Sequence, residues 1–308
     1  GVAGVGEGSI AHALPKLAMA VEGVLRHMAT QDDADHQSQA TRLVALALDA
    51  GAELFHTPGA DGDAYATIAV EGHKETWPLQ VKRFRRWLAR LLYQAEDKSP
   101  GSQAVQNALG VLEGKALYEG AALAVSTRLA EHHGALYLDL ADDQWRAVEV
   151  TSSGWRVVTD PPVKFRRARG MLPLPLPVTG GRLGALKPLV NIATEEDWRL
   201  VVSWLVAALR PRGPYPVLVL HGEQGSAKST LVRVLRALVD PNTAALRTTP
   251  RDERDLVIAA TNSWLIAHDN LSHLADWLSD ALCRLATGSG LATRELYTDA
   301  EEAIFAAQ

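Results

Sequence analysis

The chain has 308 residues, and its 31 Lys and Arg against 36 Asp and Glu give a net charge of −5. This balance excludes a protein that binds nucleic acid through bulk positive charge alone. A hydrophobic share of 47% and a charged share of 22% exclude disorder throughout and indicate a globular protein of about two domains. The single cysteine, Cys283, and apolar runs too short for a membrane span predict a cytoplasmic protein without a membrane partner.

Residues 1–160 are predicted to form an α+β domain, because amphipathic stretches come first and short alternating segments dominate later. The helices are expected at 13–28, 41–48, 82–90 and 102–117, and the strands at 52–55, 64–70, 125–128, 135–140, 147–150 and 155–158.

The helix expected at 82–90 carries five basic residues and no acid, while Phe84 and Leu88 recur at helical spacing on its apolar face. Two interpretations stay open. The basic face is either simply solvated above a buried stripe, or it contacts the phosphates of a nucleic acid.

Residues 161–190 contain six prolines, four glycines and six basic residues, with no acid. Repeated proline removes backbone donors and favours extended geometry, so this segment is predicted to be a basic linker between domains. Its cluster of basic side chains is either solvated or grips a nucleic-acid backbone. The members of that cluster are Lys164, Arg166, Arg167 and Arg169. The second domain is then expected at 191–308, beginning with a helix up to residue 209.

The strongest motif is a glycine-rich loop between an apolar run at 215–220, predicted to be a strand, and a helical pattern that extends to residue 239. This order of strand, loop and helix is typical of a phosphate-binding P-loop. Its backbone N–H groups would point inward at phosphate oxygens, aided by the positive end of the helix. The predicted nucleotide-binding residues are Gly222, Glu223, Gln224, Gly225, Ser226, Ala227, Lys228, Ser229 and Thr230.

Within this loop, Lys228 would bind the β and γ phosphates and Ser229 would bind Mg²⁺. The motif departs from its usual pattern at Ala227, where glycine is expected. Alanine is compatible with the loop if this position has right-handed helical geometry, and it is strained if φ is positive.

A second predicted strand at 263–268, reached through a helix at 252–260, ends in Asp269, which would complete the metal site. The alternative is an ordinary core strand followed by an Asp-Asn turn. Asn270 stands where many ATPases place a glutamate, and an amide orients water without accepting its proton. The neighbouring His268 is interpreted as a packed residue rather than a catalytic one.

These segments, with the helix at 277–288 and the run at 293–299, resemble the ATPase part of phage- and plasmid-type primase-helicase proteins. Those proteins are similar to superfamily 3 helicases of the AAA+ group. The resemblance implies a P-loop NTPase domain with a parallel sheet, ATP and Mg²⁺ as cofactors, DNA as partner and a hexameric ring. It also places Arg294 in a hairpin that contacts DNA, whereas a surface ion pair is the competing interpretation.

The resemblance further implies a sensor strand and an arginine finger after Ala307, so an ATPase domain incomplete at its C-terminus and weak or absent turnover are expected. The predicted function is a helicase-like motor for DNA replication of a phage or mobile element. The alternative is an ATP-switched DNA- or protein-binding module without efficient turnover. A small-molecule kinase is a third reading, for which the sequence shows no acceptor-binding motif.

Overall fold

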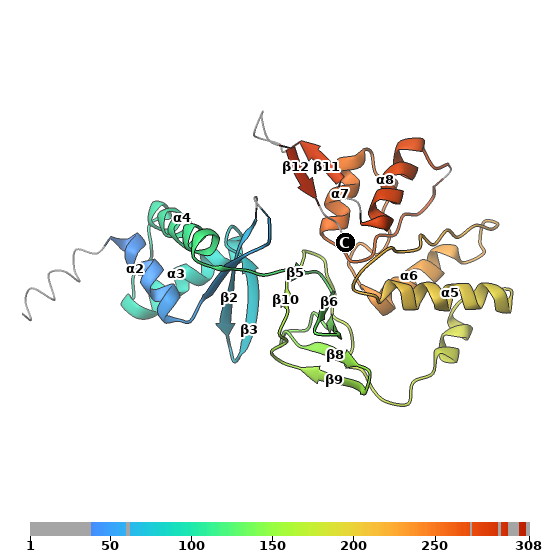
Figure 1. Cartoon of the computed structure of the whole chain (residues 1–308), viewed down its shortest axis with the longest axis horizontal. Coiled ribbons are helices and arrows are strands. Elements are labelled where there is room, and N and C mark those ends of the chain that lie inside the picture. Colours follow the sequence, from blue (N-terminus) through green and yellow to red (C-terminus); the bar gives the residue numbers. More distant parts are fainter. Residues whose placement is uncertain (1–37, 60–61, 272, 289–290, 295–301, 306–308) are drawn as a thin grey trace, which may run out of the picture. The chain divides into compact units, whose positions relative to one another are not determined.

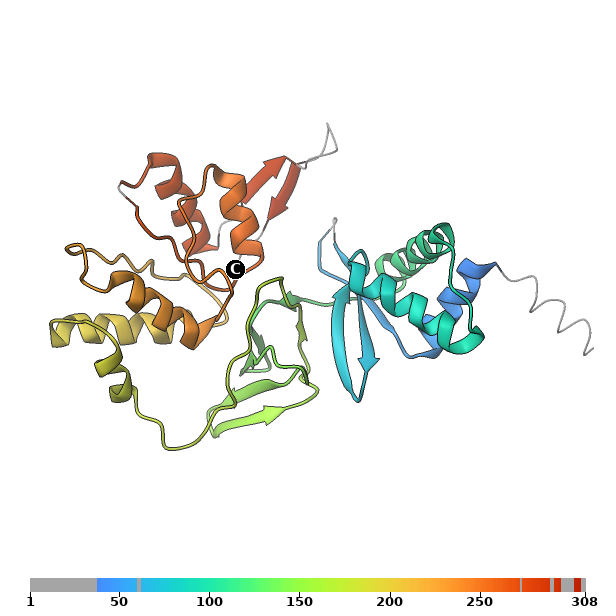
Figure 2. The same cartoon turned by 180° about the vertical axis from the view of Figure 1, so that it is seen from behind.

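The computed structural model (Figures 1 and 2) describes residues 38–59, 62–271 and 273–288, together with the backbone of two strands near the C-terminus. The chain divides into two compact units. The first comprises residues 1–56, 63–66 and 77–121, and the second comprises 57–62, 67–76 and 122–308. The helix predicted at 13–28 lies outside the described residues. Over the described ranges, no helix combines the length and apolar character needed to cross a bilayer.

Three helices and a four-stranded sheet of order β3-β2-β1-β4 organise the front of the chain. Both views show the helices grouped on one side of strands β1 to β3 (Figures 1 and 2). The elements are α2 Gln39–Asp49, β1 Glu53–His56, β2 Ala64–Val70, β3 His73–Pro78, α3 Lys82–Glu96, α4 Ser102–Tyr118 and β4 Ala121–Ala122. The helices predicted at 41–48, 82–90 and 102–117 and the first two strands are confirmed. Strand β3 was not predicted, because its polar composition hides the burial that its partners impose.

Helix α3 shows why this region folds locally as predicted. Its residues Phe84, Leu88 and Leu92 are fully buried, and their spacing of four places them on one face of the helix. Charged side chains occupy the opposite face. Helices α2 and α4 both pack against α3, so the apolar stripe belongs to the core of the first unit.

An antiparallel meander of order β6-β7-β8-β9 lies in the second unit. It consists of β6 Leu129–His132, β7 Ala135–Asp139, β8 Ala147–Thr151 and β9 Gly154–Val158, and a short parallel pair joins β5 Val125–Ser126 to β10 Lys164–Phe165. The sheet predicted in this region is confirmed, although β5 and β6 replace the single strand expected at 125–128. Strand β7 alternates buried and half-buried residues, as expected for a sheet with one face on the core.

The second unit includes residues 122–160 as well as 161–308, whereas the predicted boundary lies at 160. Residues 161–190 belong to the second unit and are not merely an extended connector. Phe165, Leu174 and Leu186 in this segment are buried, and it contains β10 and the 3₁₀ helix η1 Leu183–Leu189. Proline limits the regular structure, but the apolar residues between the prolines still gain from leaving water. Arg167 of the basic cluster is bound to Asp139 at 2.7 Å, which makes this cation part of the structure.

Four helices dominate the rest of the second unit and confirm the predicted helical segments. They are α5 Glu195–Ala208, α6 Lys228–Val239, α7 Glu253–Thr261 and α8 Asp276–Thr287, followed by the antiparallel strands β11 Leu291–Arg294 and β12 Glu302–Phe305. The hydroxyl of Thr194 accepts from the Asp197 N–H at 3.0 Å and so caps α5. Apolar residues of α5 and α6, including Leu205, Leu231 and Leu235, form one buried cluster.

The strands predicted at 215–220 and 263–268 are not formed as strands in the described part of the chain. One isolated parallel bridge joins Arg247 to His268. The backbone groups of these segments bond to side chains instead: the carbonyl of Pro216 accepts from the indole of Trp204 at 2.9 Å. A strand requires a neighbouring strand to complete its ladder, so a parallel sheet remains an expectation.

Candidate nucleotide site

The loop between the apolar segment and α6 depends on glycine at two positions. Gly222 has a φ of 152° and Gly225 a φ of 83°, which are backbone conformations that other residues rarely adopt. A Cβ atom built on Gly222 would lie 3.2 Å from the hydroxyl of Ser226. The chain therefore curls tightly here, and the Asn191 side chain donates to the Ser226 carbonyl at 3.3 Å.

Ala227 has φ 62° and ψ 24°, in the left-handed region, at the position where α6 begins. This is the strained case distinguished in the sequence analysis. A left-handed conformation costs a residue with a Cβ roughly 1–2 kcal/mol. The loop thus holds a strained alanine at the place where the usual motif has glycine.

Replacing Ala227 with glycine is expected to relieve this strain. The gain is partly offset, because glycine adds about 0.5–1 kcal/mol of backbone entropy to the unfolded state. We expect a net increase in unfolding free energy of up to about 1 kcal/mol, measured by urea denaturation. Ala237→Gly on α6 is the control, and it should destabilise by about 1 kcal/mol. Equal destabilisation by the two substitutions would contradict strain at Ala227.

Lys228 is the first residue of α6, and its ammonium group lies inside the loop. It donates to the carbonyls of Gly222 at 2.9 Å and Glu223 at 2.7 Å, and to the Ser226 hydroxyl at 3.3 Å. An ammonium group has three donors and no acceptor, so all three are directed at the loop. The loop thereby concentrates a cation and the N-terminal end of a helix at one point, an arrangement suited to phosphate.

Ser229 and Asp269 lie 40 positions apart in the sequence and are in contact. The Ser229 hydroxyl is 2.9 Å from Oδ2 and 3.1 Å from Oδ1 of Asp269. A hydroxyl and a carboxylate are hard oxygen ligands, which Mg²⁺ binds together with phosphate oxygens and water. The residues present therefore fit a magnesium ion shared with a bound phosphate. Both members of the predicted metal pair are brought to the same place.

The segment that carries Asp269 is held from one side by residues near Arg247. The Asp269 N–H donates to the Arg247 carbonyl, and the Arg247 N–H donates to the Ala267 carbonyl, both at 2.9 Å. These bonds and the bridge to His268 fix the backbone immediately before the carboxylate. Asp269 consequently meets Ser229 without belonging to a regular sheet.

The other predicted residues contribute less directly. Glu223, Gln224 and Thr230 have exposed side chains, so Glu223 acts here through its carbonyl. Asn270 is exposed, with a φ of 58°, and its N–H donates to Asp269 Oδ1 at 3.0 Å. The backbone of Arg294 lies in β11, whereas its side chain is outside the described part of the structure.

A cavity of about 730 Å³ adjoins the loop, and its lining includes Lys228, Ser229 and Asp269. Most of its remaining wall is apolar and comes from the segments 215–220 and 263–271. Small-molecule sites commonly combine an apolar wall of this volume with a few convergent polar groups. The polar residues of the candidate site are therefore continuous with a space large enough for a small ligand.

Asp240 is a residue of the site region that the sequence analysis missed. Its Oδ2 accepts from the N–H groups of Trp264 and Leu265 at 3.0 and 3.2 Å, and its Oδ1 accepts from Arg128 at 3.1 Å. Arg128 and Asp240 are 0% and 1% exposed. The pair fixes the start of the segment that ends in Asp269. Its partners lie 112 positions apart, and no local pattern signals them.

His268 directly precedes Asp269, one of the two candidate Mg²⁺ ligands, and it also lines the cavity. Its Nδ1 is 3.0 Å from the Thr248 carbonyl, which can only accept, so Nδ1 carries the proton. Burial lowers the pKa of His268, and the hydrogen bond to Thr248 opposes this while Arg247 adds to it. The imidazole is therefore neutral at neutral pH, and its buried Nε2 has no hydrogen-bond partner among the residues that the structure describes.

The lowered pKa of His268 predicts a pH-dependent stability. The pKa of histidine in the unfolded chain is about 6.5. At a higher pH, His268 is neutral in both the folded and the unfolded state, and its contribution to stability is greatest. As the pH falls below that value, the unfolded state takes up the proton first, so stability decreases until the folded pKa is reached. His268→Asn keeps a donor for Thr248 without the titration. Urea denaturation between pH 7.5 and 5 should show a smaller loss for this variant, and parallel curves would refute the assignment.

The matched family model covers residues 183–307 and is that of the actinomycete integrative conjugative element replication protein. This part of the chain is similar to a mobile-element replication protein. The match includes the loop at 222–230 and Asp269, so the whole candidate site lies within it. The predicted relation to replication proteins of mobile elements is confirmed at this level, and it fits a role in DNA replication. No curated protein matches the chain.

Proposed function

We propose that the second unit binds ATP with Mg²⁺ and uses it as a helicase-like motor in the replication of a mobile element. The observation that carries this proposal is the contact of Ser229 with Asp269 beside the loop that surrounds Lys228. Lys228 would bind the terminal phosphates, and the loop N–H groups would orient them. Bound Mg²⁺ would neutralise charge on the phosphates, with Ser229 and Asp269 as its protein ligands.

A role in replication is supported by the family match over 183–307. DNA is accordingly the proposed macromolecular partner, and a ring of identical subunits is the proposed assembly, as in the helicases that the sequence resembles. A P-loop fold with a parallel sheet belongs to the same proposal. It rests on the order of loop, helix and acidic residue along the chain.

A second candidate function is an ATP-controlled DNA- or protein-binding module. Asn270 favours it, because its amide cannot serve as a general base for an attacking water. In this reading, the bound nucleotide changes the affinity for a partner, and turnover is slow or absent.

Two measurements test the proposal on the chain of 308 residues. Titration with a fluorescent ATP analogue should show binding that strengthens with Mg²⁺, and equal affinity with Mg²⁺ and with EDTA would contradict the metal assignment. ATP turnover with and without single-stranded DNA then separates the two functions. A motor requires turnover that DNA stimulates, even from a low basal rate, whereas a switch shows nucleotide-dependent DNA affinity and a turnover rate that DNA does not change.

A further inference from the structure

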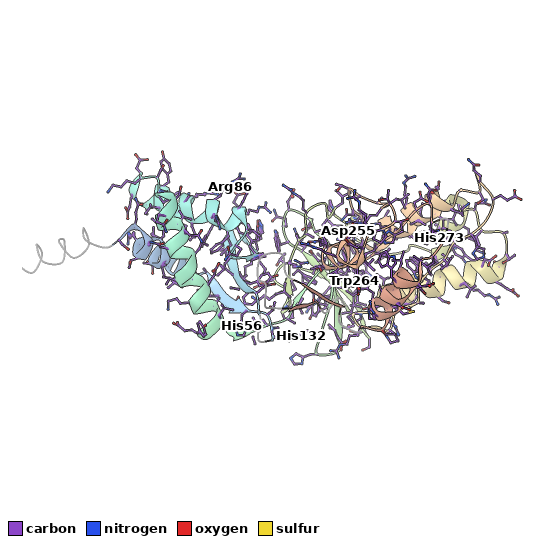
Figure 3. The ribbon with its side chains drawn as sticks, turned by 90° about the horizontal axis from the view of Figure 1, so that it is seen from above. His56, Arg86, His132, Asp255, Trp264 and His273 are labelled. Atoms are coloured by element: carbon purple, nitrogen blue, oxygen red, sulfur yellow. The ribbon has the colours of Figure 1, made fainter. Side chains whose placement is uncertain are left out.

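The first unit carries a basic surface that the proposed nucleotide site does not involve. Lys82, Arg83, Arg86 and Arg90 are exposed on α3, on the side opposite the buried stripe of Phe84, Leu88 and Leu92. Arg86 is labelled in Figure 3, where its side chain extends from α3 at the surface of the unit. We propose that this surface, the basic face of α3, binds the phosphate backbone of duplex DNA.

The cations of this face are not neutralised by the unit itself. Lys82, Arg86 and Arg90 form no ion pair with the residues that the structure describes. Arg83 stacks over the Trp77 ring at 5.3 Å, an interaction that retains its full charge. The nearest acidic residue along α3 is Glu96, at its other end, and it binds Arg42 at 2.7 Å.

Arg85 belongs to a different surface. Burial raises the pKa of Glu113 on α4, and the nearby Arg85 opposes that rise. Arg85 thus already acts on an acidic neighbour, whereas the exposed cations of α3 do not. The separation of these roles on one helix leaves a continuous basic face rather than a network of internal pairs.

The position of the charges is unfavourable for the helix in isolation. The first turn of α3 contains no acidic residue, yet it begins with Lys82 and Arg83. Cations near a helix N-terminus oppose the helix dipole and so destabilise the helix. A chain with a net charge of −5 therefore concentrates positive charge where it costs stability, which a bound polyanion would offset.

The geometry suits duplex DNA. Lys82 and Arg90 are eight residues apart, which corresponds to about 12 Å along a helix, close to the width of the major groove of about 12 Å. Binding of single strands instead relies on exposed aromatic rings for base stacking. Between Lys82 and Arg90, Phe84 is buried and Trp87 is half-buried against it. One exposed ring, Tyr93, follows Arg90 on the same helix, so the face offers a row of charges for phosphates and a single ring rather than a series of stacking rings.

The test is fluorescence anisotropy of the full chain with a 30-bp duplex of arbitrary sequence, between 50 and 200 mM salt and without nucleotide. The double substitution Arg86→Gln and Arg90→Gln should weaken binding about tenfold or more. It should also reduce the slope of log affinity against log salt by about 1.8, since each phosphate contact contributes about 0.9. Arg86→Lys with Arg90→Lys should restore both quantities, because the contacts depend on charge.

The matched control is Lys98→Gln with Lys115→Gln, which removes the same charge from the same unit and should leave both quantities nearly unchanged. Circular dichroism melting confirms that each variant is folded. Three results would overturn the proposal. They are an equal loss of duplex affinity in the control, an unchanged salt slope in the α3 variant, or tighter binding of a single strand of the same length than of the duplex. If the α3 variant loses binding to phosphatidylserine vesicles but keeps duplex binding, the basic face binds a membrane surface and the proposal is overturned.

The proposal for α3 and the proposal for the nucleotide site can be refuted independently of each other. Lys228→Ala should leave duplex binding through α3 intact when no nucleotide is present. The α3 variant should in turn bind the ATP analogue as the wild type does.

Discussion

Replacing Lys228 with alanine is expected to weaken binding of Mg²⁺ and an ATP analogue about 100-fold or more. The ammonium is the cation inside the loop, where it lies 2.7–2.9 Å from the Gly222 and Glu223 carbonyls. A hydrogen bond to a charged group contributes about 1.5–3 kcal/mol, and 1.4 kcal/mol corresponds to a factor of ten in affinity. Two such contacts to phosphate oxygens account for the expected loss.

Isothermal titration calorimetry of the variant measures this effect. Arg233→Ala is the matched control, since Arg233 is an exposed cation on the same helix, and its removal should change affinity less than threefold. Urea denaturation should show that Lys228→Ala is folded. If both variants bind the analogue like the wild type, the loop at 222–230 is not the nucleotide site.

Replacing Asp240 with alanine is expected to lower the free energy of unfolding by about 3–5 kcal/mol. The substitution would remove the carboxylate that pairs with two buried guanidinium groups, those of Arg128 and Arg236. Arg128 would keep its hydrogen bonds to the Asp139 and Leu172 carbonyls. Removing one partner of a buried ion pair typically costs this amount. It would also remove the acceptor for two backbone N–H groups at Trp264 and Leu265.

The measurement is urea denaturation followed by circular dichroism. Asp240→Asn retains an acceptor oxygen and should be less destabilising, which keeps the comparison informative if the alanine variant does not fold. The control is Glu195→Ala, which breaks the exposed pair of Glu195 with Lys187 and should lower the free energy of unfolding far less than Asp240→Ala does. A loss below 1 kcal/mol for Asp240→Ala would contradict the role of the buried pair.

This second experiment also reports on the candidate site. Asp240 fixes the backbone at the start of the segment that ends in Asp269, so its loss should loosen the contact of Asp269 with Ser229. Asp240→Asn is therefore expected to weaken Mg²⁺-dependent nucleotide binding more than nucleotide binding in EDTA.

Local sequence was sufficient for the described helices and for the position of the glycine-rich loop before α6. Helix periodicity depends on neighbours three and four residues apart, so α3 and α6 follow from their own apolar spacing. The motif also singled out Lys228, Ser229 and Asp269, because phosphate and Mg²⁺ chemistry restricts which residue types can serve at that spacing. The structure brings Ser229 and Asp269 into contact, and their role with Mg²⁺ stays a prediction. The condition set for Ala227 was likewise local, since it depends on one φ angle.

Only the tertiary structure determines which long-range contacts fix the predicted segments in place. Whether residues 215–220 form a strand depends on neighbouring strands, which the composition of this segment does not specify. Burial of Phe165 and Leu174 in the proline-rich segment depends on the sheet that they meet. The pair of Arg128 with Asp240 joins positions 112 residues apart. Local spacing determines helices and motifs, whereas long-range contacts, including this buried ion pair, arise only when the folded chain brings their partners together.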